Sequence, residues 1–306
     1  MNGHQDDGTR PGGPAPARTT VGWSGSGASR RALRWALLEA CAAGGAVHVV
    51  AVDPPREPAP PGGAAPVPPS ASLPAALAEE LERLPGRCPP VSTTVTTGDV
   101  PSGAGAVAAA LLVAAADGGW LVLGCGRHAD PLTAGHVLRG CVPRSPVPVV
   151  LVGPGAVLTR PRRLLVLADA ALAAASDAAV ELTARRARTV GCDVRLLTEP
   201  AAPGRSRPGS AHRHRTTRQQ LAAAAHRPAV AGPVDGPPGD AVARAQRTGD
   251  LAVAAAADVA VLPLRTLRVP VVLVPPAART VVLPDTAHAG AQPSTSTGRP
   301  AVPSRT

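Results

Sequence analysis

The same strand-like apolar sequence occurs twice in this chain. Val-Pro-Val-Val-Leu-Val spans residues 147–152 and again residues 269–274. A weaker similarity precedes each copy. The segments 98–123 and 232–253 both begin at a glycine, continue through a helical pattern and end in an apolar strand. Self-similarity of this kind indicates a duplicated supersecondary unit rather than one large single-core domain.

Within each copy, short apolar runs alternate with helical patterns. In the first copy we expect strands at 20–23, 47–52, 91–96, 120–123 and 147–152. We expect helices at 28–43, 73–84 and 133–141, and an Ala-rich helix that follows the turn at 98–101 and ends at Ala116. In the second we expect strands at 164–168, 194–197, 229–231, 251–255 and 269–274, and helices at 171–188, 219–225 and 239–247. This order predicts an α/β fold of two doubly wound parallel sheets of five strands each.

The remaining segments read as linkers and tails. Proline and glycine are abundant, with 37 and 32 residues. We therefore predict a disordered leader at 1–18, a first domain at 19–153, a degenerate second domain at 162–275 with an insertion at 199–215, and a disordered tail at 276–306.

Composition excludes several classes of function. Phe and Tyr are absent, so Ala, Val and Leu must fill the core, and the stacking aromatics of a single-strand nucleic-acid binder are missing. All basic residues are Arg, and the resulting net charge of +10 bears on solubility and non-specific binding rather than on the fold. Five dispersed cysteines without a CxxC pair suit a reducing compartment. With no secretory leader and no long apolar span, a cytoplasmic protein without membrane contact is expected.

Five ordered motifs carry a resemblance to a known family. They are Val-Gly-Trp-Ser-Gly-Ser at 21–26, Ala-Leu-Arg-Trp-Ala at 32–36, Gly-Asp-Val-Pro at 98–101, Trp-Leu-Val-Leu-Gly at 120–124 and Ser-Pro-Val-Pro-Val-Val-Leu-Val at 145–152. Together they resemble the universal stress protein (UspA) family over about 19–152, and a weaker match follows over about 162–275. The resemblance implies strand order 3-2-1-4-5, as in adenine nucleotide alpha hydrolase-like and Rossmann-like folds.

ATP-binding members of that family have a glycine-rich loop after the fourth strand, whose backbone N–H groups hold phosphate. The resemblance implies a nucleotide-binding set, for ATP or AMP, of Ser24, Ala51, Gly124, Gly126, Arg127, Gly135, His136 and Val137. This chain departs from the pattern. Arg127 stands where the second glycine belongs, Gly135-His136 replaces Gly-Ser, and Ser24 replaces an Asp. In the second copy, Asp169 retains the acidic residue at the end of the first strand. The segment from Ala255 to Val269, however, is too short for a phosphate-binding loop and its helix. We therefore expect weak binding in the first copy only.

Other arrangements of reactive residues are weaker candidates. Residues 22–26 approach the Gly-x-Ser-x-Gly elbow of hydrolases but lack its last glycine and the later Asp and His, so a turn before a helix is favoured. His212, His214 and His226 have no acid or Cys to complete a metal shell, so no metal is expected. The Arg cluster within 205–227 is interpreted as a charged loop rather than a polyanion site. Cys125 is interpreted as a packing residue rather than a redox thiol.

These observations predict a non-catalytic stress-response or regulatory protein that senses ATP or AMP weakly. The alternative is an interaction scaffold with vestigial nucleotide sites. An enzyme of the same fold would need a complete phosphate loop or a flavin-stacking aromatic, and neither is present. The strands 147–152 and 269–274 are expected at sheet edges that need cover, either in an intramolecular pseudo-dimer of the two domains or in a homodimer.

Overall fold

The computed structural model describes residues 18–53, 67–97, 104–126, 134–156, 158, 163–168, 173–198, 229–233, 251–255 and 270–275. Residues 1–17 of the predicted leader, the tail, the insertion at 199–215 and the helices expected at 219–225 and 239–247 lie outside these residues, whereas Arg18, the last residue of that leader, begins the first strand. No helix within the described ranges is long and apolar enough to cross a membrane.

In the first half, strands and helices alternate. The elements are β1 (Arg18–Trp23), α1 (Gly27–Ala43), β2 (Ala46–Asp53), α2 (Pro69–Glu82), β3 (Val91–Thr97), α3 (Ala104–Ala115), β4 (Trp120–Gly124), α4 (Ala134–Cys141), the short 3-10 helix η1 (Val142–Arg144) and β5 (Val149–Val152). β2, β4 and β5 are nearly continuous apolar runs, as expected for parallel strands covered on both faces, whereas the edge strand β3 is rich in Thr and largely exposed.

The second half supplies six further elements: β6 (Arg163–Ala168), α5 (Ala173–Val190), β7 (Asp193–Thr198), β8 (Ala229–Pro233), β9 (Leu251–Ala255) and β10 (Val271–Val274). Each strand falls on a strand predicted above, with its ends shifted by no more than two residues.

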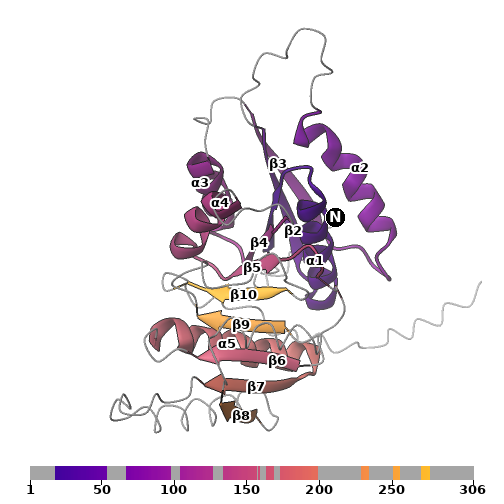
Figure 1. Cartoon of the computed structure of the whole chain (residues 1–306). Coiled ribbons are helices and arrows are strands. Elements are labelled where there is room, and N and C mark those ends of the chain that lie inside the picture. Colours follow the sequence, from indigo (N-terminus) through magenta and orange to yellow (C-terminus); the bar gives the residue numbers. More distant parts are fainter. Residues whose placement is uncertain are drawn as a thin grey trace, which may run out of the picture.

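The α/β fold is confirmed, but the expectation of two separate sheets is wrong. All ten described strands form one sheet in the order β3-β2-β1-β4-β5-β10-β9-β6-β7-β8. The first half follows the order 3-2-1-4-5, and the second half runs through the same order from its own outer edge inward. Figure 1 shows the two sets of strands as one continuous layer.

The seam between the halves is the pairing of β5 with β10. These strands are antiparallel, whereas the other strand pairs in the described sheet are parallel, and Val150 lies opposite Val272. The two copies of Val-Pro-Val-Val-Leu-Val therefore pair with each other. Each of these strands ends its own half of the sheet, as expected, and covers the other's edge within the one chain, so β3 and β8 end the shared sheet.

Two hydrophobic clusters cover the faces of this sheet. One joins α1 and α2 to residues of α5, β6 and β9, so it extends across both halves. The other packs α3 and α4 on the opposite face and includes Val271 and Leu273 of β10. In Figure 1, α1 and α2 lie on one side of the first-half strands, and α3 and α4 lie on the other.

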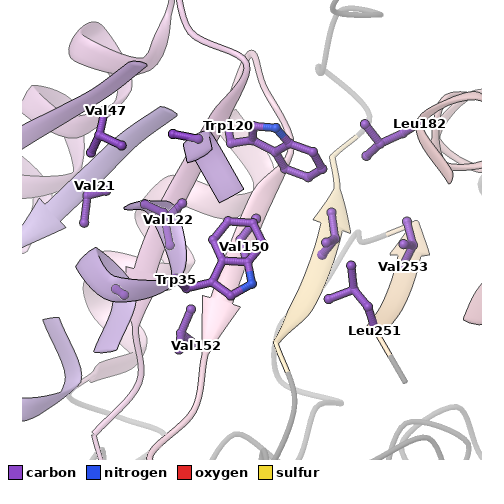
Figure 2. Packing of buried hydrophobic residues seen from close by; sticks show 14 of the residues in the cluster. Val21, Trp35, Val47, Trp120, Val122, Val150, Val152, Leu182, Leu251 and Val253 are labelled. Carbon is purple, nitrogen blue, oxygen red and sulfur yellow. The ribbon is translucent and has the colours of Figure 1, made fainter. Parts of the chain in front are cut away.

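The first cluster contains the two tryptophans that pack together. The rings of Trp35 and Trp120 meet edge to face, with centroids 6.2 Å apart and planes at 76°. Figure 2 shows them between the first-half valines and Leu182, Leu251 and Val253 of the second half. In a chain without Phe or Tyr, this pair is the largest aromatic contribution to the core.

A buried ion pair also joins the two halves. Glu39 of α1 and Arg186 of α5 form a salt bridge, and their side chains are 7% and 8% exposed. Burial lowers the pKa of Arg186 to about 10, so the guanidinium remains charged at neutral pH. The charge of each partner is balanced across the boundary between the halves.

Candidate functional site

The candidate site lies at the carboxyl ends of β1 and β4. These parallel strands are neighbours, with Val21 opposite Val122. After β1 the chain enters α1 on one face, and after β4 it continues toward α4 on the other face. The order of strands therefore reverses between β1 and β4, which is where open α/β sheets form ligand crevices.

The turn after β1 is built from small polar residues. Gly25 has φ of 70°, a conformation that glycine adopts without strain. Ser26 is the N-cap of α1, and its hydroxyl accepts a hydrogen bond from Ser29 N at 3.2 Å. The exposed Ser24 hydroxyl lies 3.0 Å from that of Ser26. The first turn of α1 has no acidic residue, so its positive dipole end is not neutralised by one.

Gly124 ends β4 directly against the start of α1. A Cβ placed on Gly124 would collide with the carbonyl of Ala28 and lie 2.8 Å from Ser29 N. The next residue is held in place as well, because Cys125 N donates to Val152 O at 2.8 Å. Gly124 is therefore needed for helix and strand to approach, whether or not a ligand binds.

The other predicted site residues are not all brought to this edge. Gly126 follows Cys125 and is the last described residue before the gap at 127–133, so Arg127 lies outside the described residues. The backbone of Gly135 and His136 belongs to the first turn of α4, within the helix expected at 133–141. Ala51 is fully buried opposite Trp23, and Val137 packs between α3 and α4.

Asp53 is a residue at this edge that sequence reasoning did not select. Its carboxylate accepts hydrogen bonds from Ser70 N at 3.2 Å and from Ser70 Oγ at 2.5 Å. Trp23 Nε1 donates to Pro69 O at 2.9 Å. The beginning of α2 is therefore tied to the ends of β1 and β2. An acid directly after a buried strand is the signal that could have located Asp53.

The remaining chemistry at this edge is limited. Cys125 is fully buried, and burial raises the pKa of its thiol to about 12, so it stays protonated. The packing interpretation of Cys125 fits this position. No group of three or more His, Cys, Asp or Glu side chains within the described ranges could hold a metal ion. Asp169 and residues 256–269, the second-half counterparts, lie outside the description.

Comparison with known proteins agrees with this fold. Residues 17–153 match the model of the universal stress protein family, so the first half of the chain carries a domain of that family. No curated protein matches the chain. A universal stress protein from Archaeoglobus fulgidus DSM 4304 aligns over 85% of this chain and 97% of its own, with TM-score 0.58 and 14% identity.

A protein of unknown function from Pseudomonas aeruginosa PAO1 gives a similar result. It aligns over 86% of this chain and 94% of its own, with TM-score 0.52 and 16% identity. At such identities these alignments establish a shared fold, and the fold they share extends beyond the segment matched by the family model.

Proposed function

We propose that this chain is a non-catalytic, cytoplasmic stress-response protein whose first half binds ATP or AMP weakly at the carboxyl ends of β1 and β4. The observation that carries the proposal is the capped N-terminus of α1, which has no acidic residue in its first turn and follows β1 where the strand order reverses. The phosphates would lie against the α1 N-terminus, where backbone N–H groups and the dipole favour anions. The Ser24 hydroxyl would donate to the sugar side of the ligand.

The geometry supports weak rather than tight binding. Ser24 supplies one hydroxyl and no charge at the end of β1. Asp53, the nearby acid on β2, is already engaged by Ser70. The same engagement supports a non-catalytic role, because this carboxylate is not positioned as a general base.

Gly27 offers a sharp test of this site. It is the first residue of α1, and a Cβ there would meet nothing within 4 Å. Gly27→Glu adds an acid that suits the helix dipole but repels phosphate, so ATP affinity should fall about tenfold or more at low salt. Gly27→Ala, which adds the side-chain carbon without the charge, should bind as the parent does. Titration with labelled ATP measures both.

Two results would contradict this assignment. If the parent binds ATP and Gly27→Glu binds it equally well, the nucleotide occupies another surface. If the parent shows no binding at millimolar ATP, the alternative function remains, an interaction scaffold with vestigial nucleotide sites. That alternative is favoured by the contact of α2 with the turn, since a Cβ on Gly25 would lie 3.1 Å from Ser72 Oγ.

We also propose that the chain is an intramolecular pseudo-dimer of two copies of one unit, the second degenerate. Support comes from the matching strand orders and from the antiparallel pairing of identical sequences in β5 and β10. This seam uses the edge that each half would otherwise offer to a partner. Light scattering should give the mass of one 30.5 kDa chain. Twice that mass would instead indicate the homodimer.

A further inference from the structure

Two cysteines meet at the end of α1 that is remote from the candidate nucleotide site. Cys41 lies in the last turn of α1, and its thiol donates to the carbonyl oxygen of Arg87 at 3.3 Å. That carbonyl belongs to the planar peptide unit that also contains the Cα of Cys88. The Cys41 sulfur is therefore separated from the backbone of Cys88 by a single peptide unit. The segment carrying Cys88 joins α2 to the edge strand β3.

The two thiols differ in accessibility. Cys88 is exposed, whereas Cys41 is half-buried. Burial raises the pKa of the Cys41 thiol, and the neighbouring Cys88 raises it further, as expected for two sulfurs that would become anionic side by side. The other three cysteines, Cys125, Cys141 and Cys192, are buried. An oxidant in solution would therefore reach Cys88 first.

The connection between α2 and β3 has the freedom that a disulfide would need. Gly86 has φ of 90°, and a Cβ at that position would meet nothing within 4 Å. The Cys88 sulfur makes only a long contact of 3.9 Å to Leu81 O. A disulfide would require the Cys88 sulfur to turn from Leu81 O toward the sulfur of Cys41.

We propose that Cys41 and Cys88 are a peroxide-responsive pair that closes reversibly into a disulfide. Hydrogen peroxide oxidises the Cys88 thiolate to a sulfenic acid, and one oxygen of the peroxide leaves as water. The Cys41 thiol then attacks the Cys88 sulfur, the S–S bond forms, and the sulfenic oxygen leaves as a second water. The two thiols lose two hydrogens and two electrons in total, and one peroxide becomes two waters. A dithiol reductant reverses the step.

Closing this disulfide would restrain the entry to β3. Val47 N donates to Pro90 O at 2.9 Å, immediately before β3 begins, so the segment from Cys88 to Val91 sets the start of the strand. β3 pairs with β2 on one side and is the last strand of the described sheet on the other. An edge strand of this kind opens locally more easily than the core. The oxidised protein should therefore hold β3 more firmly.

The test uses the full chain treated with hydrogen peroxide and then alkylated. Tandem mass spectrometry of the unreduced digest should identify one cross-link, between Cys41 and Cys88 of the same chain, which dithiothreitol removes. Hydrogen exchange of the β3 amides should become roughly tenfold slower in the oxidised form and recover on reduction. Amide exchange in β4, which the pair does not touch, is the internal reference.

Serine variants separate the two roles. In Cys41→Ser, a sulfenic-acid probe should label Cys88, because the thiol that resolves this intermediate is missing. In Cys88→Ser, neither the cross-link nor the label should form, and β3 exchange should no longer respond to peroxide. The proposal is overturned if Cys88 of the parent protein ends as a sulfinic acid, or cross-linked to a second chain, while Cys41 remains a thiol.

Discussion

Arg186→Met should lower the free energy of unfolding by about 3 to 5 kcal/mol, the cost of leaving one member of a buried ion pair without its partner. Glu39 would then be a buried carboxylate whose salt bridge across the two halves is lost. Methionine retains much of the length and apolar volume of the arginine stem, so the loss reports the charge rather than a cavity. Urea unfolding followed by circular dichroism measures the change.

Two further variants establish that burial is the cause. Combining Arg186→Met with Glu39→Met removes both charges, and most of the lost stability should return. Arg30→Met is the exposed control, because Arg30 pairs with Glu79 of α2 and both side chains are more than 40% exposed. This variant should lose no more than about 1 kcal/mol of unfolding free energy. Equal losses of unfolding free energy in Arg186→Met and Arg30→Met would show that burial does not make the Glu39–Arg186 pair more important to stability than an exposed pair.

Gly124→Ala should destabilise the protein by about 3 kcal/mol or more, because the added carbon collides with backbone atoms of α1 that cannot rotate away. Either β4 or the first turn of α1 must move. The change should appear in thermal and urea unfolding in the absence of any nucleotide.

Gly105→Ala is the matched control for this substitution. A Cβ at Gly105, inside α3, meets nothing within 4 Å, so alanine there should be neutral or stabilising by up to about 1 kcal/mol. A fully stable Gly124→Ala protein that had lost only ATP binding would contradict the packing role of Gly124. For the same reason, loss of affinity in a Gly124 variant is not by itself evidence of a phosphate contact.

The strands and most helices could be predicted because their causes are local. An apolar run such as 47–52 is buried on both faces, and the Leu33–Leu37 spacing of α1 follows the helical period. The start of α2 was predicted at Leu73 but lies at Pro69. Proline is tolerated at the beginning of a helix, and Asp53, distant in sequence, binds Ser70 there. No local pattern contains that contact.

Which of the two expected ways of covering the edges of β5 and β10 occurs could not be decided from sequence, for a related reason. An apolar strand that needs an edge partner looks the same whether the partner is in the same chain or another. The pairing of Val150 with Val272 is fixed by long-range packing, including the contact of α1 with α5 through Glu39 and Arg186. The identical hexapeptides indicated a duplication whose edge strands need cover, but they did not decide between pairing within one chain and pairing with a second chain.

The site expected at the strand ends stays a prediction, and its residues were selected by counting along a motif. That counting selected Gly135 and His136 as phosphate-binding residues, and the structure places their backbone in α4, the helix expected at 133–141. It also selected Gly124 for phosphate approach, whereas the collision with Ala28 is a requirement of the fold. Whether Arg127 contacts a ligand stays a prediction, since it lies outside the described residues.

The antiparallel seam has a geometric consequence for any ligand. Because β10 runs opposite to β5, the strands of the two halves point toward opposite borders of the shared sheet. A crevice at the β1–β4 border and its counterpart beside β6 and β9 would therefore open in opposite directions. One small molecule could not bridge them, and influence between them would have to pass through the valines of the seam and the Glu39–Arg186 pair.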